Sequence, residues 1–433
     1  MKNFRDEYNN KLKTASGLAG EIPAKCGIWI DIGLGQPKAI ISALEDRAKK
    51  EKLDLTVNTM LDVYDMPWFS GTGIDGIRGI SWFSGAGARK AVNSGIADIM
   101  PCYYRDVPKL LRQNSQIDCI CASVSPMDKH GYFSLGLTAS ASEDMLLRAE
   151  YIMLEVNKQM PRSVNSPQIH ISRVSALCES DYPLPVSEAA QTDDISRRIG
   201  EIIADEIPSG STIQLGIGAI PDAVGMALKD KHDLGIHTEL FTDSMVELIE
   251  CGAVNNSRKP VNTGRSVTAF AYGSKRIYDY VDDNPAIALM PVDYVNNPDT
   301  IALHKNFMSV NSAVEVDLFG QVCAESAGTK HISGTGGQTD YVRGAVMSEG
   351  GKSFIAFSST AKGGTVSRIV STLANGAVVS TSKNDVDHVV TEYGIAKLRG
   401  KTLSQRTKAL IGLAHPKFRE ELIYSAKKRN III

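Results

Sequence analysis

Short apolar runs alternate with amphipathic stretches along most of the chain. The apolar runs predict buried strands, and the stretches between them predict helices that pack one apolar face on a sheet. This alternation is typical of α/β proteins with mainly parallel sheets. The predicted strands are Ile28–Ile32, Cys119–Val124, Tyr151–Val156, Thr212–Leu215, Ile287–Met290, Phe354–Phe357 and His388–Thr391. The predicted helices are Ala39–Arg47, the later part of Pro185–Glu206, Asp222–Asp230, Ser244–Glu250 and Leu403–Lys428, the last divided at Pro416.

Two segments of the chain resemble each other. Trp29–Leu44 and Ile213–Leu228 each contain an apolar strand, a G-x-G turn, a proline and an Ala/Leu-rich helix. Two such units predict two related open α/β/α domains, residues 1–185 and 186–433, with the boundary in the polar segment Glu179–Glu188. The alternative is a chance similarity between two ordinary strand–helix units.

The turn in the second of these segments is Gln214-Leu-Gly216-Ile217-Gly218-Ala219-Ile-Pro221. Glycines between a strand and a helix let backbone N–H groups point at an anion. Pro221 stands where the dinucleotide-binding fingerprint needs a third glycine, so a nicotinamide site and a Rossmann-type dehydrogenase are weakly supported. Taken alone, the turn is more simply a tight connection without a ligand.

Two further segments are rich in glycine. Ser333–Gly344 contains Gly334, Gly336, Gly337 and Gln338, which predicts a loop whose backbone approaches something closely. Phe69–Ile80, followed by Ser84–Gly87, predicts a long surface loop.

The composition bears on the kind of partner and on the location of the protein. In 433 residues, 47 Lys and Arg oppose 49 Asp and Glu, and the net charge of -2 argues against nucleic acid as a partner. Seven cysteines without a C-x-x-C pair predict reduced, mostly buried thiols. The N-terminus lacks the apolar segment of a signal peptide, and no apolar run approaches the ~18 residues that a membrane helix needs. We therefore expect a cytoplasmic protein without a membrane segment.

The candidate chemistry that remains is that of a carboxylate. The eight His have no metal-binding spacing, and the G-x-S-x-G elbow of serine hydrolases is absent from the sequence. In Gly235-Ile-His-Thr-Glu239 a short strand is predicted to end at Glu239, at the edge where parallel sheets bind ligands. Glu392, in Val389-Val-Thr-Glu392, has the same kind of position and is the rival. For either residue alone, a solvated or capping role is the simpler interpretation.

Several motifs in a fixed order change this balance, because together they resemble the acetyl-CoA hydrolase/transferase family. The resemblance is strongest to its branch of 4-hydroxybutyrate and butyrate:acetate coenzyme A-transferases, and it covers nearly the whole chain. The motifs are Gln214–Pro221, His237–Asp243, Asn311–Gln321, Ser333–Gln338, Ser359–Gly364 and Val390–Gly394.

The resemblance implies two CoA-transferase-type domains, with Glu239 as the glutamate that attacks the acyl-CoA. It implies transfer of coenzyme A between an acyl-CoA and a short-chain carboxylate such as acetate, butyrate or 4-hydroxybutyrate, by a ping-pong mechanism through a glutamyl-CoA thioester. Coenzyme A is then a substrate, and we expect no permanently bound cofactor. An acyl-CoA hydrolase using the same glutamate and a non-catalytic CoA-binding protein are the alternatives.

The glycine segments become candidate binding elements in this interpretation. We expect N–H groups around Gly216–Ala219 or Gly336–Gln338 to bind CoA or to stabilise a tetrahedral oxyanion. Lys362 and Arg368 are candidates for contact with the CoA phosphates, although a solvated role is as simple. We also expect a homo-oligomer.

Overall fold

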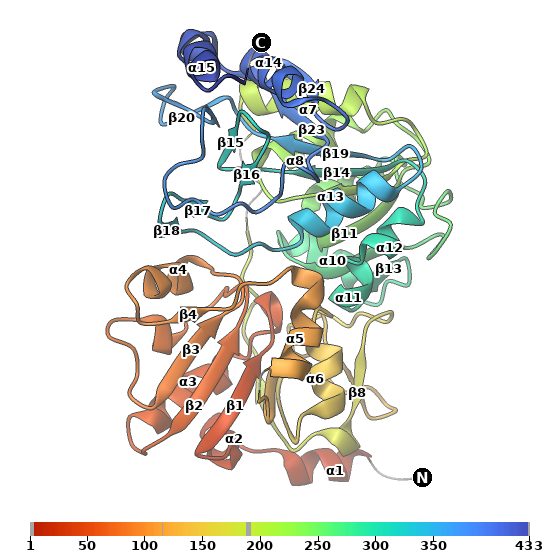
Figure 1. Ribbon diagram of the computed structural model, residues 1–433. Coiled ribbons are helices and arrows are strands. Elements are labelled where there is room, and N and C mark those ends of the chain that lie inside the picture. The colour runs from red at the N-terminus through yellow and green to blue at the C-terminus, as the bar shows by residue number, and fades with distance from the viewer. Residues whose placement is uncertain (1–3, 115, 188–191, 432–433) are drawn as a thin grey trace. The chain divides into compact units, whose positions relative to one another are not determined.

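The computed structural model describes residues 4–114, 116–187 and 192–431 (Figure 1). The chain divides into two compact units, one within residues 1–187 and 267–294 and the other within 188–266 and 295–433. Both units combine helices with mainly parallel strands, so the predicted α/β class is confirmed. None of the helices in the described ranges has both the length and the apolar character of a membrane-spanning segment.

The first unit is built on a parallel sheet of seven strands in the order β4-β3-β2-β1-β5-β7-β9. The strands are β1 (Lys25–Ile30), β2 (Asp54–Thr59), β3 (Ile77–Ser81), β4 (Asp98–Ile99), β5 (Cys119–Val124), β7 (Tyr151–Asn157) and β9 (Ala176–Ser180). The helices before residue 187 are α1 (Phe4–Lys11), α2 (Ala15–Glu21), α3 (Lys38–Ala48), α4 (Ala86–Asn93), α5 (Val107–Asn114) and α6 (Ser142–Arg148). A small hairpin pairs β6 (Tyr132–Ser134) with β8 (Gln168–His170), and the later segment holds β12 (Ser266–Ala271), α10 (Lys275–Val281), β13 (Ile287–Leu289) and α11 (Val292–Val295).

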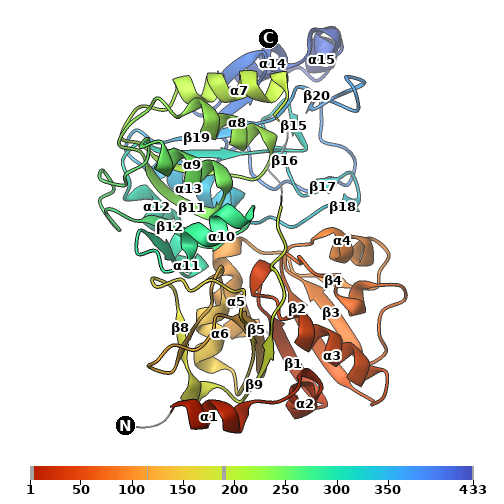
Figure 2. The same ribbon diagram turned by 180° about the vertical axis from the view of Figure 1, so that it is seen from behind.

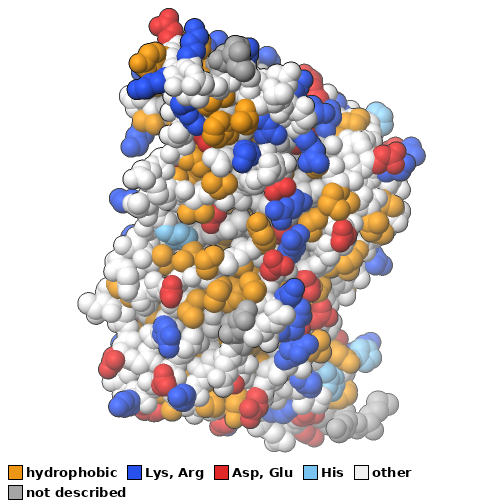
Figure 3. All heavy atoms as spheres, in the orientation of Figure 1, with side chains coloured by type: hydrophobic (Ala, Val, Ile, Leu, Met, Phe, Trp, Pro, Cys, Tyr) orange, Lys and Arg blue, Asp and Glu red, His pale blue; other side chains and the backbone are white. Residues whose placement is uncertain are grey.

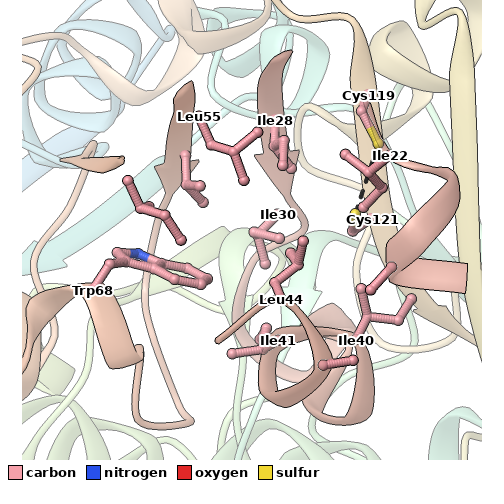
Figure 4. Packing of buried hydrophobic residues seen from close by; sticks show 14 of the residues in the cluster. Ile22, Ile28, Ile30, Ile40, Ile41, Leu44, Leu55, Trp68, Cys119 and Cys121 are labelled. Carbon is pink, nitrogen blue, oxygen red and sulfur yellow. Dashed lines mark hydrogen bonds between the residues drawn. The ribbon is translucent and has the colours of Figure 1, made fainter. Parts of the chain in front are cut away.

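Alternation along β1 explains how this core forms. Ile28 and Ile30 point to one face of the sheet, where α3 buries Ile40, Ile41 and Leu44 against them (Figures 2 and 4). Two thiols on β5, those of Cys119 and Cys121, lie on the same face with their sulfur atoms 3.8 Å apart (Figure 4). All seven cysteines are free, and five of them are buried.

The second unit contains six strands in the order β11-β10-β14-β19-β23-β24, parallel except for the last. Helices α7, α8 and α9 lie on one face of these strands and α13 on the other (Figures 1 and 2). The strands are β10 (Thr212–Leu215), β11 (Gly235–Phe241), β14 (Phe307–Asn311), β19 (Lys352–Ala356), β23 (His388–Thr391) and β24 (Gly394–Lys397). The helices are α7 (Asp194–Asp205), α8 (Ala219–Ala227), α9 (Asp243–Glu250), α12 (Pro298–Ala302), α13 (Gln338–Met347), α14 (Leu403–Leu413) and α15 (Pro416–Lys428). Short strands β15 (Glu315–Asp317), β16 (Val322–Cys323), β17 (Ser326–Ala327), β18 (Lys330–His331), β20 (Thr360–Ala361), β21 (Val366–Ser367) and β22 (Ile369–Val370) form small ladders beside them.

The two sheets share a connection pattern. In the first, β1 lies between β2 and β5, and in the second, β10 lies between β11 and β14. In both, the chain moves outward in one direction and then returns to the other side of the starting strand, which is the switch point where open α/β sheets bind ligands. The G-x-G turns follow β1 and β10, so each turn lies at the switch point of its own sheet.

One prediction about a glycine-rich segment is wrong, and another is confirmed in its close backbone approach, at Gly337, but not in its length. Phe69–Ile80 and Ser84–Gly87 do not form one long surface loop, because strand β3 and helix α4 lie within this region. Gly79 is part of β3, where a side chain would collide with the rings of Trp68 and Phe69. Ser333–Gly344 is a loop only up to Gly337, where helix α13 begins.

Other boundaries are close to the prediction. The long C-terminal segment is split at Pro416 into α14 and α15, as predicted. The predicted helix within Pro185–Glu206 is α7, and residues 188–191 of that range lie outside the described residues. Strand β11 continues two residues past Glu239, to Phe241.

Candidate active site

Glu239 lies on β11, next to the strand that leads into the second G-x-G turn. β11 is parallel to β10 in the register Thr212↔Gly235 and Ile213↔Ile236. The strand is buried on both sides except at Glu239, which is partly exposed. A carboxylate at this point faces the carboxyl edge of the sheet, as the sequence predicts.

Two hydrogen-bond donors hold the Glu239 carboxylate. The side-chain amide of Asn296 donates to Glu239 Oε2 at 2.7 Å, and the backbone N–H of Gly337 donates to the same carboxylate. Burial raises the pKa of Glu239 to about 7, and the two donors oppose this rise. The ionised carboxylate is therefore available near neutral pH, while its basicity is higher than that of an exposed glutamate.

Gly337 must be a glycine because it lies so close to this carboxylate. A Cβ added at Gly337 would overlap Glu239 Oε2 and Asn296 Nδ2. Its φ of -97° is open to any residue, so the close approach and not backbone conformation excludes a side chain. Gly337 is also the N-cap of α13, and the positive end of that helix favours a negative charge at Glu239.

Further groups support Asn296. Tyr341, on the first turns of α13, donates its hydroxyl hydrogen toward Asn296 Oδ1 at 3.3 Å. Because a carboxylate only accepts hydrogen bonds, this arrangement directs the amide nitrogen of Asn296 to Glu239. The preceding carbonyl, Val295 O, lies 2.7 Å from Nε2 of His237. His237 is two residues before Glu239 and therefore faces the same side of β11.

The Gly216–Ala219 turn is open in structure. Gly218 has a φ of 120°, which favours glycine strongly, and Ile217 is 67% exposed. Helix α8 begins at Ala219. The side chain of Gln214, on β10, pairs reciprocally with Asn311 at the end of β14, at 3.0 and 3.3 Å. Gln214 thus ties together the two strands of the switch point.

The other predicted positions have structural partners. Gln338 donates to Thr381 Oγ1 at 3.2 Å, and Gly334 and Gly336 belong to the loop that leads to Gly337. The rival carboxylate Glu392 accepts from the hydroxyl of Ser359 at 2.6 Å and from its N–H at 2.9 Å.

The two candidate phosphate ligands differ in exposure. The guanidinium of Arg368 donates to the carbonyls of Ala313 and Val314 and lies over the ring of Phe357. Lys362 is exposed, with a φ of 50°, in the hairpin between β20 and β21. Lys362 is therefore the more exposed of the two.

The sequence did not single out Asn296, Tyr341 or His237. His237 carried a signal, because residues two apart on a strand share a face with Glu239. Asn296 lies in an irregular segment between α11 and α12, where no periodicity predicts a direction for its side chain. Among the described residues, no three His, Cys, Asp or Glu gather as ligands for a metal ion.

Comparisons with known proteins show the family of this chain. Residues 1–188 match the acetyl-CoA hydrolase/transferase N-terminal domain, and residues 273–426 match the C-terminal domain of the same family. A succinyl-CoA:cyclohexane-1-carboxylate CoA transferase of Geobacter metallireducens is 43% identical, over 100% of this chain and 98% of its own. A 4-hydroxybutyrate coenzyme A transferase of Clostridium kluyveri is also 43% identical, over 98% of this chain and 99% of its own.

Solved structures lead to the same family. The crystal structure of RipA from Yersinia pestis is 37% identical and superposes with a TM-score of 0.95, over 99% of this chain and 100% of its own. A 4-hydroxybutyrate CoA-transferase of Porphyromonas gingivalis is 34% identical with a TM-score of 0.81, over the same shares of the two chains. With both domain models matched and relatives similar over their full length, the chain belongs to the acetyl-CoA hydrolase/transferase family.

Proposed function

We propose that this protein transfers coenzyme A between an acyl-CoA and a short-chain carboxylate, with Glu239 as nucleophile and a glutamyl-CoA thioester as intermediate. The observation that carries the proposal is the Glu239 carboxylate, whose pKa burial raises to about 7 and which Asn296 and Gly337 hold on the strand next to the switch point. Several full-length relatives at 38–43% identity bear the names of CoA-transferases, whereas an acetyl-CoA hydrolase is 24% identical.

In each step of the proposed reaction, one bond forms and another breaks. A Glu239 oxygen attacks the thioester carbonyl and expels CoA thiolate, which leaves a mixed anhydride. The thiolate then attacks the glutamyl carbonyl, the bond between the glutamyl carbon and the bridging oxygen breaks, and the first acid departs with that oxygen. A second carboxylate reverses these steps and leaves as the new acyl-CoA. Since one thioester replaces another, no ATP is needed.

The two donors fit the glutamyl half of this sequence. Asn296 holds Oε2, so attack through Oε1 would keep a donor on the glutamyl carbonyl oxygen throughout the reaction. When thiolate adds to that carbonyl, negative charge develops on Oε2. The backbone of Gly337 lies close to this oxygen. One oxyanion donor of this kind is typically worth ~10²- to 10³-fold in rate.

The remaining parts of the proposal concern binding and organisation. We assign CoA contacts to the open turn Gly216–Ala219, in which Ile217 is 67% exposed and Gly218 has a φ of 120°, and we treat CoA as a substrate and not as a resident cofactor. We keep residues 1–185 and 186–433 as the proposed domains, with Glu239 in the second. The family models match residues 1–188 and 273–426, close to this boundary, although residues 267–294 group with the first compact unit. The cytoplasmic location and the homo-oligomeric state stay predictions.

Trapping the intermediate tests the nucleophile. Borohydride added after an acyl-CoA should reduce a glutamyl thioester, and mass spectrometry should place the modification on the peptide that holds Glu239. Glu239→Gln should lose at least ~10³-fold in turnover and show no trapped product. Glu201→Gln, at an exposed ion pair on α7, is the matched control and should keep full activity. Trapping on another residue, or turnover that survives Glu239→Gln, contradicts the proposal.

A second measurement separates transfer from hydrolysis. With acetate present, a transferase converts acyl-CoA to acetyl-CoA and releases little free CoA, because the thiolate is recaptured. A thiol assay that shows equal CoA release with and without acetate identifies a hydrolase instead. A panel of acyl-CoA donors and carboxylate acceptors then gives the preferred acids.

A further inference from the structure

Two buried imidazoles lie next to the site, and the reaction described above uses neither of them. His237 and His304 are each 0% exposed, and their ring centroids are 4.9 Å apart. The rings of Phe307 and Tyr341 extend this cluster to helix α13. The cluster therefore lies between the strand that carries Glu239 and the helix whose N-cap touches it.

His237 makes one short contact that bears on the nucleophile. Its Nε2 lies 2.7 Å from the carbonyl oxygen of Val295. A carbonyl oxygen only accepts hydrogen bonds, so this nitrogen carries the hydrogen. The next residue along the chain is Asn296, the side-chain donor to Glu239 Oε2. The contact thus fixes the backbone from which the Asn296 side chain reaches Glu239.

The imidazole makes this contact as a neutral donor. Burial lowers the pKa of His237 well below its usual value, and the nearby His304 and Lys259 lower it further. The single hydroxyl hydrogen of Tyr341 is shared between Asn296 Oδ1 and Val295 O, and the hydroxyl lies 3.4 Å from the latter. His237 is therefore the closer of the two side-chain donors to this carbonyl.

We propose that His237 is a positioning residue for the transfer reaction: through its hydrogen bond to Val295 O it holds Asn296 against Glu239. The inference rests on the proposed role of Glu239. Asn296 touches the nucleophile itself, so loss of this support should change the chemical steps more than binding. Small misplacements of such groups cost up to ~10²-fold in rate.

His304 provides a matched contrast within the same cluster. It is as deeply buried as His237, and burial lowers its pKa to about 3, so it is also neutral. Neither of its ring nitrogens has a hydrogen-bond partner among the described residues. Replacing this ring by that of phenylalanine removes no hydrogen bond, and it removes two buried polar atoms that lack partners.

Three variants test the proposal by steady-state kinetics with an acyl-CoA and acetate. His237→Phe keeps a ring without the donor, and we expect kcat to fall about 10- to 100-fold while KM for acyl-CoA changes by less than about threefold. His237→Gln has an amide N–H at the same number of bonds from the backbone, and we expect it to recover most of kcat. His304→Phe should keep the kcat of the parent protein. Thermal unfolding of each variant accompanies the kinetics.

The outcomes are distinct from those for Glu239. Full kcat in His237→Phe overturns the positioning role, and so does an equal loss in His237→Phe and His237→Gln at unchanged melting temperature. A loss in His304→Phe as large as in His237→Phe indicates a packing effect of the whole cluster and also overturns it. In each case Glu239→Gln is still inactive if Glu239 is the nucleophile, whereas activity in Glu239→Gln rejects the proposed function itself.

Discussion

The two units use the same strand–turn–helix element in opposite ways. In the first, Gly33, Leu34 and Gly35 are buried in a turn that closes over Asp31, whose carboxylate accepts from Thr138, Ser142 and its neighbour's N–H. In the second, the turn is open to solvent at Ile217, and the residue two before its first glycine is Gln214 instead of an acid.

The position of the carboxylate explains this difference. Asp31 satisfies hydroxyl and amide donors of its own unit, so it stabilises the fold around the first turn. The second turn has no acid of its own, and Glu239 comes from the adjacent strand to meet Gly337, a glycine almost a hundred residues further along the chain. The repeated element is therefore structural in the first copy, whereas in the second it is exposed at Ile217, where we propose that it contacts CoA. On the face drawn in Figure 3, acidic and basic side chains are interspersed. An anionic substrate would therefore have to be bound by local groups and not by a broad positive surface.

The largest effect should come from closing the contact at Gly337. In Gly337→Ala the new methyl group collides with Glu239 Oε2 and Asn296 Nδ2. We expect kcat to fall by about 10²-fold or more, because the nucleophile and its donor must separate. The melting temperature should fall as well, because Gly337 is buried, so the decisive quantity is kcat per folded molecule. Kinetics and calorimetry on the same sample check both parts. A variant that keeps its kcat would contradict the proposed geometry.

Gly35→Ala is the corresponding change in the first unit, and its effect should appear in stability. A Cβ at Gly35 would overlap the Asp31 carboxylate and lie 3.0 Å from Thr138 Oγ1. Forcing a methyl group into such a site typically costs about 1–3 kcal/mol. Urea unfolding should show this loss, with kcat per folded molecule little changed. If Gly35→Ala lowers the activity but not the stability, the first turn is not purely structural and the contrast between the two turns is wrong.

The sequence predicts the framework better than the site. Strands β5, β10 and β23 have the predicted limits because buried parallel strands are plain apolar runs, and Pro416 marks a helix boundary directly. The predicted family, fold class and CoA transfer agree with the relatives. Strand β3 was missed because Gly79 is needed beside Trp68, a tertiary requirement that no local pattern reveals.

The same limit applies to the active site. The residue pattern alone does not choose between Glu239 and Glu392, since both follow apolar strands of one sheet. The choice depends on family resemblance and then on the partners, which are Asn296 for Glu239 and Ser359 for Glu392. Asn296 is 57 positions from its partner, and contacts at that separation arise only from the assembled sheet.

The pH dependence of the rate should depend on a carboxylate of the second unit, Glu239, and not on one of the first. Glu239 attacks only when ionised, and its pKa is about 7, so kcat/KM should rise about tenfold per pH unit below this value and level off above it. The pKa of Asp62, in the first unit, is also about 7. Asp62→Asn should leave the midpoint of the rate profile unchanged. A shifted midpoint would show that Asp62, and not Glu239, is the group whose ionisation controls the rate.

The smallest expected effect concerns stability at Asp62. Its carboxylate accepts from Gln36 Nε2 at 2.9 Å and from Thr59 Oγ1 at 3.3 Å, but burial dominates and raises its pKa from 3.8 to about 7. The folded state therefore binds more protons here than the unfolded state, and this group makes the protein less stable as the pH rises from about 4 to 7. Asparagine does not titrate, so Asp62→Asn removes that slope.

Urea midpoints of Asp62→Asn and the parent protein at pH 5, 6, 7 and 8 measure the effect. Relative to the parent, the variant should gain about 1–2 kcal/mol between pH 5 and 8, less than the full pKa shift implies, because water reaches part of the side chain. Most of the gain should occur below pH 7, where Asp62 titrates. If the free energies of unfolding of the variant and the parent stay parallel over this pH range, the ionised Asp62 does not destabilise the fold. Its carboxylate would then be solvated well enough to offset burial.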